Sequence, residues 1–531
     1  MGRGANIGSI QNLEEQIKEH EMAIIKLKRA RNSLLDVSAL PPEVLGKIFH
    51  LNVTVEGDFD GPEERSYNFL LVCHYWFGVA TQTPGLWTFW GNNAQDWGRR
   101  YLRSNVAIPL DLVLDSVKYP FSGISEYQQA MLKERATRDT IRQIHLRSDM
   151  RKTLTPIISP LLSPSGGLQT KSLESLTLRT NDEIPLDVSF LIQSYLPKLQ
   201  HLELFNCTIS SWGHLASQTT LLTTLDLFFD EPSPAPAMRQ LLSALVSNPY
   251  LRKLRLATRA IPDDNDDDEL SRVSLPHLSD LQLDGGVGQV FRLLRRLEFP
   301  RETATLELGL SNAQVTDISQ TIGPYLQDYL QCRGKLLDGL GLSVSFTRSV
   351  TLELGDPWAP NLEPSCLAQM VVFTSINIEL DQALGDLVDE SVLVLIAYIP
   401  RGDIIYLRAC GSLKVAKGLQ VQLPNLKTLD LRRLPLSAFF PTPDQGQQNV
   451  QELLPSSLEH ILLEEFFVTG FDWHSLIAYL LRRVAHGNKL NSLLINGRCH
   501  VCWSIILELN TLVRKFRITD SCMGWCPFEV C

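Results

Sequence analysis

Cysteine and histidine side chains gather toward the C-terminal end of the sequence, as Cys499, His500, Cys502, Cys522 and Cys526. A Cys-x-x-Cys pair followed by a second pair about twenty residues later has the spacing of a tetrahedral zinc site. The second pair here has three intervening residues rather than two, and residues 503–516 between the pairs are apolar, as in a capping strand and helix. We therefore expect free thiols and no metal, with zinc binding as the alternative.

Two further stretches match known ligand sites only in part. Residues 263–269 are acidic but lack the sixth-position glycine and the spaced glutamate of an EF-hand loop, so we expect a solvated loop, with calcium binding as the alternative. Residues 285–288, Gly-Gly-Val-Gly, lack the third glycine of a dinucleotide fingerprint, which favours a turn. No phosphate-binding loop, nucleophile elbow or His-Glu-x-x-His motif occurs. The sequence therefore predicts neither an enzyme nor a cofactor.

Composition limits the class of protein and its partners. The 531 residues are 44% apolar and 20% charged, as in ordinary globular proteins, and the formal net charge is −10. This negative charge argues against a nucleic-acid or an anionic-membrane partner. The ten cysteines are scattered, no signal peptide precedes them, and the longest apolar run, residues 392–399, is too short to span a bilayer. We expect a reduced cytoplasmic or nuclear protein.

The elements that organise the chain repeat a Leu-x-x-Leu-x-Leu template. Clear copies start at Leu173, Leu199, Leu222, Leu251, Leu278 and Leu426. Weaker copies start at Thr303, Ser349, Phe373, Ile404, Leu458 and Leu490. Successive starts are 22 to 32 residues apart, except for one gap of 46 residues. The copy at Leu199 continues through Cys207, in the turn position of a leucine-rich repeat.

Helical patterns lie between the copies, at residues 238–246, 290–297 and 472–486. Asp472 is the expected N-cap of the last helix, and Gly487 follows its expected end. One strand and one helix cannot bury their apolar faces alone, so neighbouring repeats must stack. The sequence therefore predicts an α/β leucine-rich-repeat solenoid with a parallel sheet on the concave side. An ordinary α/β domain with leucine-rich strands is the alternative.

Two regions depart from the regular repeat. Before the first copy, residues 108–114 and 141–146 alternate like strands, and residues 125–140 between them have a helical pattern. Within the long gap, Leu337-x-x-Leu340-x-Leu342 precedes the copy at Ser349 by only 12 residues. The spacing there predicts either a hairpin or an irregular repeat.

Residues 38–91 have the pattern of two short helices and a tryptophan-containing exit. The first helix begins at Leu40-Pro41-Pro42-Glu43, where proline and a negative charge suit a helix N-terminus. The second is expected over residues 67–81, with an apolar stripe that includes Val72 and Trp76. Thr-Pro-Gly-Leu-Trp at residues 83–87 then ends the helix.

The segments Leu-Pro-Pro-Glu-Val-Leu-x-x-Ile-Phe, Leu-Val-Cys-x-x-Trp-x-x-x-Ala and Thr-Pro-x-Leu-Trp, in this order, resemble an F-box, in the F-box-like form common in fungi. Members of that family bind a Skp-type adaptor and so join a cullin-based ubiquitin ligase. Two features depart from the family pattern: His74-Tyr75 stand where basic residues are usual, and residues 50–66 form a longer link than usual.

The resemblance implies that the apolar anchors of this segment bind the adaptor. They are Leu40, Pro41, Leu45, Ile48, Phe49, Val72, Cys73, Trp76, Leu86 and Trp87. The alternative is that the segment is only a helical cap on the rest of the protein.

The N-terminal residues 9–34 have a helical pattern with a heptad seam. Its members are Ile10, Leu13, Ile17, His20, Ile24, Leu27, Arg31 and Leu34. About three clean heptads occur, near the lower limit for a coiled coil, and His20 and Arg31 interrupt them. The pattern predicts either a dimerising coiled coil or a solitary amphipathic helix packed on the F-box-like segment.

In a repeat strand the leucines point into the core and the intervening residues face the concave side. The intervening residues that we expect to bind a target are His201, Glu203, Phe205, Arg252, Lys253, Arg255, Lys427 and Arg432. The basic cluster at residues 252–255 is unusual in an acidic chain, and guanidinium groups suit carboxylates or phosphates. We therefore expect an acidic or phosphorylated target segment. The alternative is that these charges solvate the sheet or pair with Glu203 and Asp280 on neighbouring strands.

These patterns predict a helix over residues 1–37, an F-box-like domain over 38–91, a linker with the first strand–helix units over 92–172, and a repeat solenoid with a C-terminal cap over 173–531. The expected function is a substrate receptor of a cullin-based ubiquitin ligase, which binds a Skp-type adaptor and an unknown target protein. An F-box-bearing scaffold with a ligase-independent role is the alternative. An enzyme built on the solenoid lacks a cluster of acid, base and nucleophile.

Overall fold

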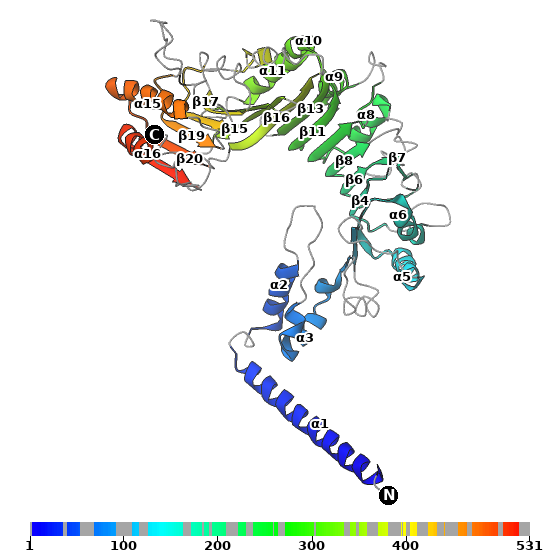
Figure 1. The fold of residues 1–531 in the computed structure, drawn as a ribbon. Helices are drawn as coiled ribbons and strands as arrows, with labels where there is room; N and C mark the ends of the chain where they lie inside the picture. The colour runs from blue at the N-terminus through cyan, green and yellow to red at the C-terminus, as the bar shows by residue number, and fades with distance from the viewer. Residues whose placement is uncertain are drawn as a thin grey trace. The chain divides into compact units, whose positions relative to one another are not determined.

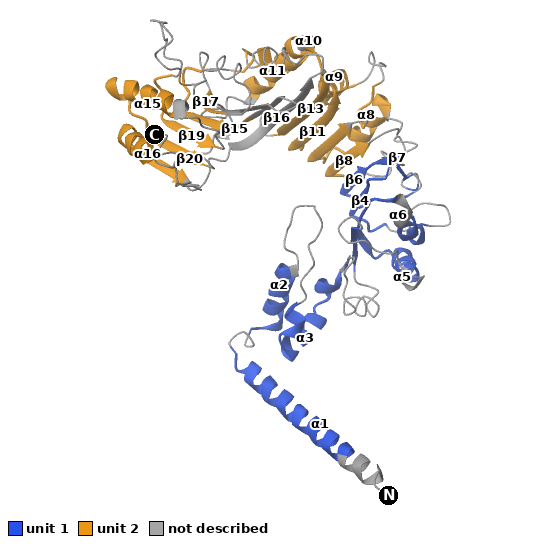
Figure 2. Ribbon diagram, viewed as in Figure 1, with its two compact units in different colours: residues 1–209 blue, residues 210–531 orange. Residues whose placement is uncertain are grey.

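The computed structural model describes much of the chain in two compact units, residues 1–209 and 210–531 (Figure 2). The described residues are 3–35, 40–53, 68–91, 109–115, 126–162, 171–182, 185–188, 190, 194–208, 221–229, 237–258, 260–263, 271–301, 304–333, 340–346, 350–357, 370–380, 394–395, 397–399, 404–410, 423–432, 440, 455–464, 470–496 and 503–519. Both units combine helices with parallel strands, so the predicted α/β class is confirmed, with helices at the N-terminus and a large parallel sheet.

The first unit begins with short and long helices (Figure 1). They are α1 Arg3–Ser33, α2 Pro42–Val53, the 3-10 helix Asn68–Leu71, α3 His74–Thr81 and the 3-10 helix Pro84–Trp87. The prediction of one helix over residues 67–81 is wrong. Cys73 has an extended backbone (φ −161°, ψ 168°), and its Sγ accepts a hydrogen bond from the Trp76 amide over 3.5 Å, so it caps a new helix.

Parallel strands follow the helices of the first unit. Neighbouring strands, in spatial order, are β1 Phe89–Gly91, β2 Leu110–Asp115, β3 Ile141–Ser148, β4 Ser175–Thr180 and β6 His201–Phe205. Between them lie α5 Glu126–Thr137, α6 Arg151–Ile158 and the 3-10 helix Ser159–Leu161. A small parallel pair consists of β5 Leu186–Asp187, between β4 and β6 in the sequence, and β7 Cys207–Thr208, just after β6. The predicted strand–helix–strand order ahead of the first clear repeat is confirmed.

The second unit begins with regular strand–helix alternation. Its parallel neighbours are β8 Thr224–Phe229, β9 Lys253–Thr258, β11 Asp280–Gly286 and β13 Thr305–Ala313. A parallel pair, β10 Val273–Ser274 and β12 Leu297–Glu298, accompanies them. The helices are α8 Met238–Val246, α9 Val287–Arg296, α10 Val315–Asp317, the π-helical turn Ile318–Ile322 and α11 Gly323–Arg333. In Figure 1, α8, α9 and α11 lie along one face of the strands.

The middle of the second unit contains three strands whose spatial order is the reverse of their order in the sequence. Its strands are β14 Leu340–Phe346, β15 Val350–Pro357 and β16 Met370–Leu380. β15 is antiparallel to both β14 and β16, whereas β16 is parallel to β13 and β14 is parallel to β17, Ile404–Cys410. Of the two predictions for the long gap, the hairpin is therefore confirmed. The copy at Ser349 does not begin a parallel repeat strand.

The remaining strands of the second unit are again parallel neighbours. They are β17, β18 Thr428–Arg432, β19 His460–Glu464, β20 Ser492–Asn496 and β21 Lys515–Thr519. α15 Gly470–Ala485 and α16 Trp503–Leu512 lie between the later strands in the sequence. α15 begins before Asp472, so that residue is not its N-cap. Gly487 follows the helix with φ +76°, as expected for a glycine beyond a helix end.

The leucines of the template build the core by matching across strands. Leu254 on β9 is in register with Leu225 on β8 and Leu281 on β11, and Leu281 with Leu306 on β13. All four are at most 4% exposed. Fully burying a leucine side chain contributes roughly 1.5–3 kcal/mol, so this alignment stabilises each added strand. The residues between the leucines are left on the other face, as the two-residue alternation predicts.

Candidate docking surfaces

The segment 40–91 has an apolar core of its own. Its buried members are Leu45, Phe49, Phe69, Leu70, Val79, Ala80, Leu86 and Trp87. Phe49 stacks on Phe69 with ring centroids 4.5 Å apart and meets Trp76 at 5.1 Å. The Tyr75 hydroxyl donates to the Leu40 carbonyl over 2.9 Å, which ties α3 to the residues ahead of α2. These contacts hold α2 and α3 against each other.

The predicted adaptor anchors divide between this core and the surface. Leu45, Phe49, Leu86 and Trp87 are at most 2% exposed and belong to the core. Leu40, Cys73 and Trp76 are partly buried, and Pro41, Ile48 and Val72 are exposed. We therefore assign the four buried anchors a structural role, because they do not reach the surface in the free protein.

An apolar surface remains on the outside of this core. It consists of Val44, Ile48 and Leu51 on α2, together with Leu71 and Val72 ahead of α3. The α2 members are spaced at i, i+4 and i+7, so they share one face of the helix. Their exposed fractions are 41%, 45% and 69%, and those of Leu71 and Val72 are 81% and 52%. We call the segment 40–91 the module and these five residues its apolar face.

Polar side chains of the first-unit sheet pair across strands. Glu203 on β6, a predicted target contact, accepts from the Arg179 guanidinium on β4, and it lies 3.5 Å from the Thr177 hydroxyl. Arg142 donates to both carboxylate oxygens of Asp111, at 3.0 and 2.7 Å. His201 and Phe205 flank Glu203 on alternate positions of β6, as predicted.

His145 lies in the same sheet, in register with Thr177 of β4. Burial lowers the pKa of His145, although the nearby Glu203 carboxylate opposes that shift. Burial likewise lowers the pKa of His201. The sheet therefore favours neutral imidazoles at both positions.

Cross-strand pairing also engages the basic cluster of the second unit. Lys253 Nζ lies 3.6 Å from Asp280 Oδ2 on β11, and Arg255 Nη1 lies 3.8 Å from Asp226 Oδ2 on β8. The predicted alternative of pairing with Asp280 is thus confirmed for Lys253. Arg252 precedes β9 and is exposed; within the described part of the chain its side chain has no ion pair. Arg252 is therefore the cation of this cluster that is open to a partner.

Two carboxylic acids lie close to this cluster on the same face. Burial raises the pKa of Asp284 on β11, an effect opposed by its hydrogen bond from Gln282 at 3.2 Å and by the charge of Arg255. Burial also raises the pKa of Glu307 on β13, and the neighbouring Asp284 adds to the rise. The face thus carries interspersed charges of both signs.

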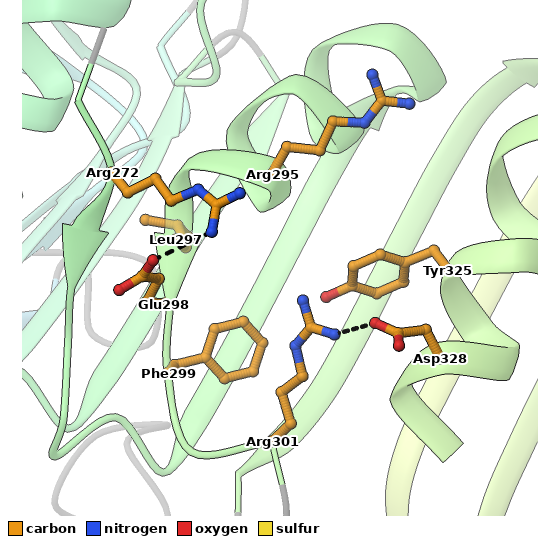
Figure 3. Close-up of a pocket in the computed structure, with 8 residues that line it drawn as sticks. All are labelled: Arg272, Arg295, Leu297, Glu298, Phe299, Arg301, Tyr325 and Asp328. Carbon is orange, nitrogen blue, oxygen red and sulfur yellow. Dashed lines mark hydrogen bonds and ion pairs between the residues drawn. The ribbon is translucent and has the colours of Figure 1, made fainter. Parts of the chain in front are cut away.

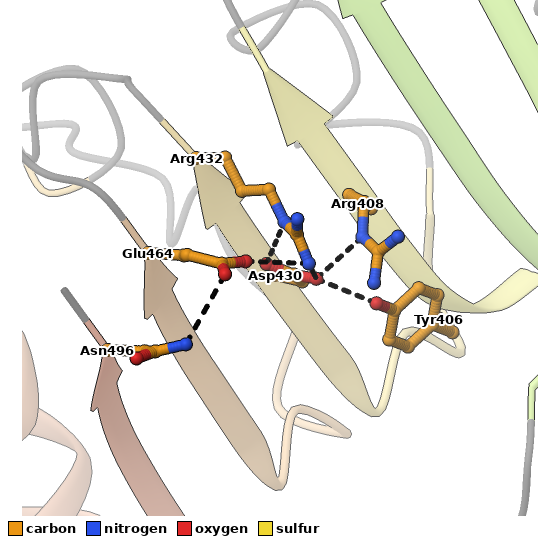
Figure 4. A network of polar contacts seen from close by, with 6 residues as sticks. All are labelled: Tyr406, Arg408, Asp430, Arg432, Glu464 and Asn496. Atoms are coloured by element: carbon orange, nitrogen blue, oxygen red, sulfur yellow. Dashed lines mark hydrogen bonds and ion pairs between the residues drawn. The ribbon is translucent and has the colours of Figure 1, made fainter. Parts of the chain in front are cut away.

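The later strands carry a polar ladder centred on Asp430, which is 1% exposed (Figure 4). Its Oδ2 accepts from the Tyr406 hydroxyl at 2.8 Å and from Arg408 Nε at 2.7 Å. Burial raises the pKa of Tyr406, and the charge of Asp430 adds to the rise, so the phenol stays a neutral donor. The ladder spans β17 and β18 through buried charge-assisted hydrogen bonds.

Arg432, a predicted target contact, extends this ladder to the next strands. It bonds Asp430 at 3.4 Å and Glu464 on β19 at 2.6 Å, and Glu464 also accepts from Asn496 on β20 at 3.3 Å. Figure 4 shows these side chains in one row across the strands. The Arg432 guanidinium therefore already binds carboxylates within the sheet. Lys427 precedes β18 and is exposed.

A hollow of about 490 Å³ opens beside α9 and α11 (Figure 3). It is lined by Arg272, Arg295, Leu297, Glu298, Phe299, Arg301, Tyr325 and Asp328. Both carboxylates are engaged, Glu298 by Arg272 at 3.3 Å and Asp328 by Arg301. The Arg301 guanidinium lies 5.4 Å from the Tyr325 ring centroid. The lining thus offers donors and apolar walls without an unengaged carboxylate base.

The sequence patterns did not single out this hollow. Its arginines come from segments separated in sequence, and the only signal was the arginine density of residues 292–301 in an acidic chain. The buried Tyr325 hydroxyl has no hydrogen-bond partner among the described residues, and burial raises its pKa. The partners of Arg432 were missed for a similar reason, because cross-strand register decides them.

The C-terminal cysteine cluster at positions 499, 502, 522 and 526 lies outside the described residues, as does the acidic run after Asp263. Where side chains are described, no group of three or more Cys, His, Asp and Glu could hold a metal ion. Among the helices of the described residues, none is both long and apolar enough to cross a membrane.

A scan against protein-family models finds no match to this chain. A search of the curated proteins also finds no match.

Proposed function

We propose that the chain is the substrate-receptor subunit of a cullin-based ubiquitin ligase. The apolar face of the module, which consists of Val44, Ile48, Leu51, Leu71 and Val72, is the observation that carries the proposal. Five large apolar side chains stay exposed beside a core that is already complete. Several exposed apolar side chains around one small core are typical of a protein-binding site.

The resemblance of residues 40–87 to an F-box supplies the identity of the partner, a Skp-type adaptor. In this proposal, Ile48 and Val72 contact the adaptor directly, together with the other members of the apolar face. The buried Leu45, Phe49 and Trp87 hold α2 and α3 at the angle that presents that face. Docking onto an exposed helix face matches a common mode of protein recognition.

The parallel strands with intervening helices support a leucine-rich-repeat solenoid as the target-binding part. In-register leucine rows and the helices along one face agree with stacked repeats. Arg252 and Lys427 are the cations that we assign to target recognition, because Lys253, Arg255 and Arg432 already have carboxylate partners. An acidic or phosphorylated target segment suits these exposed cations.

The receptor performs no bond chemistry in this proposal. It holds a target and the ubiquitin-charged enzyme in one assembly, which raises the effective concentration of target lysines near the enzyme. The protein's own contribution is therefore two binding surfaces on one chain.

The test is co-purification of the full chain with the Skp-type adaptor, for wild type and for Ile48→Asp and Val72→Asp. Both variants should lose the adaptor, because a charge at a buried interface costs several kcal/mol. Val246→Asp is the matched control: Val246 is 57% exposed on α8, close to the 52% of Val72. Wild-type protein that does not bind the adaptor, or variants that bind it normally, would refute the proposal. Adaptor binding without ubiquitin transfer to any partner would indicate a scaffold.

A further inference from the structure

The N-terminal helix α1 exposes an apolar seam along its length. The seam positions and exposed fractions are Ile10 54%, Leu13 58%, Ile17 57%, Ile24 51%, Leu27 71% and Leu34 84%, the last just beyond the helix end. They alternate in steps of three and four residues, with His20 and Arg31 at the remaining seam positions. A stripe with this period lies on one side of a helix and suits a second helix.

An unpaired α1 leaves its apolar seam in water. The helix has 31 residues. Helices in proteins owe most of their stability to the packing of an apolar face against another element. The seam of α1 is not covered by the described residues, since each apolar member is more than half exposed.

We propose that α1 pairs with α1 of a second copy of this chain in a parallel, in-register, two-stranded coiled coil. Residue types at the seam decide the number of strands. Isoleucine occupies the first core position of three successive heptads, at 10, 17 and 24, and leucine occupies the second at 13, 27 and 34. Isoleucine at the first position with leucine at the second favours two parallel strands.

Charges beside the seam agree with the parallel direction. In a parallel pair, Gln16 lies near Glu21 of the second copy, and Ala23 lies near Lys28, so no like charges meet at these flanking positions. At the core, Arg31 lies in one layer with Arg31 of the second copy, near the end of the helix. An antiparallel pair that overlaps the whole seam sets Glu21 against Glu21 of the second copy, although it also pairs Glu14 with Lys28. The isoleucine–leucine pattern therefore favours parallel helices, and the flanking charges do not oppose them.

His20 fixes the register. In the in-register pair, His20 lies in one layer with His20 of the second copy, so two polar groups meet each other. A shift of one heptad would place each His20 against a leucine, Leu13 or Leu27, and leave buried polar groups unpaired. A polar residue at one core position is known to specify register at some cost in stability. This interaction is independent of whether the module binds an adaptor.

The test measures the mass of the full chain in solution by sedimentation equilibrium at micromolar concentrations. Wild type should be a dimer. Ile24→Asp should weaken the dimer by roughly a hundredfold or more, because it buries a charge in the seam. Ile25→Asp makes the same change one residue later, off the seam, and should leave the dimer intact. His20→Leu should tighten it. A wild-type monomer, or equal loss in the Ile24 and Ile25 variants, would overturn the proposal.

Direction is tested by cysteine cross-linking in the full chain. With Ile17→Cys, oxidation should join the two substituted positions to each other, and mass spectrometry of the linked peptide identifies the bond. The antiparallel arrangement would instead place position 17 opposite position 27, so that a cross-link forms only in the Ile17→Cys/Leu27→Cys double variant. That result would contradict the parallel arrangement.

Discussion

The indole N–H of Trp87 donates to the backbone carbonyl of Ala80 over 2.8 Å. Both residues are at most 2% exposed. The bond joins the 3-10 turn Pro84–Trp87 to the last turn of α3, so the exit of the module is fixed to its helix. Trp87 therefore maintains the shape that presents the apolar face.

Replacing Trp87 separates stability from docking. Trp87→Phe keeps an aromatic ring but loses the bond to the Ala80 carbonyl, which still accepts from the Thr83 amide at 3.1 Å. We expect a loss of about 0.5–1.5 kcal/mol in unfolding free energy. Trp87→Ala should cost about 3–5 kcal/mol because it also leaves a cavity. Urea unfolding of the full chain, followed by tryptophan fluorescence, measures both.

Adaptor binding by Trp87→Phe distinguishes the two roles. We expect near-normal affinity at a temperature where the variant is folded, because the ring does not reach the surface. A folded Trp87→Phe protein that had lost the adaptor would show that this side chain contacts the partner directly.

We predict that the buried His145 lowers the free energy of unfolding in mild acid. Its pKa is lowered in the folded state by burial, whereas an unfolded histidine titrates near pH 6.5. As the pH falls from about 7.5 to 5.5, the unfolded chain binds a proton that the folded chain does not, so the free energy of unfolding decreases. The charged groups around His145 are Glu203, Arg179, Asp115 and Arg147.

The His145 contribution appears as a difference between variants. We expect His145→Gln to flatten the dependence of the melting temperature on pH over that range, relative to wild type. Parallel curves for wild type and His145→Gln would mean that other groups cause the effect.

Asp430 should be essential to the later strands. Asp430→Asn removes a buried charge that binds Tyr406, Arg408 and Arg432, and removing one partner of a buried ion pair typically costs about 3–5 kcal/mol. Hydrogen exchange should become faster in β17, β18 and β19. Asp280→Asn, which weakens a more exposed pair at 3.6 Å, should change exchange little. Equal protection from hydrogen exchange in the two variants would show that the ladder does not stabilise these strands.

The cysteines near the C-terminus have a separate prediction. If they are free thiols, purified protein should contain no stoichiometric zinc by elemental analysis, because no tetrahedral set of ligands forms. One zinc per chain, lost in a Cys502→Ser variant, would reverse this preference.

Much of the α/β organisation was predictable because leucine spacing reports burial directly. α8 occupies the predicted residues 238–246, and Leu202 and Leu204 are buried on β6 as the template requires. The template could not distinguish β15 from a repeat strand, because alternation with a period of two is the same in parallel and antiparallel strands. Strand direction depends on contacts with β14 and β16, which lie elsewhere in the sequence.

The candidate surfaces were less predictable than the fold. An apolar residue such as Phe49 or Ile48 suits both a core and an interface, and only the packed structure separates them: their exposed fractions are 1% and 45%. Arg432 likewise is a residue type that often binds ligands, but its register with Glu464 gives it an ion-pair partner within the sheet. Residue type shows what a side chain can bind, whereas register decides what it meets.

The basic cluster before and within β9 gives the last prediction. Arg252→Glu should remove target partners while adaptor binding survives, because Arg252 is exposed and the apolar face lies on other residues. Lys253→Asp combined with Asp280→Lys keeps the ion pair between β9 and β11 but exchanges its charges, and it serves as the control for sheet integrity. Affinity purification under proteasome block, followed by mass spectrometry, compares the partner sets. If both variants keep the wild-type partners, targets bind elsewhere; if Arg252→Glu alone loses them, the exposed cation ahead of β9 recognises the target.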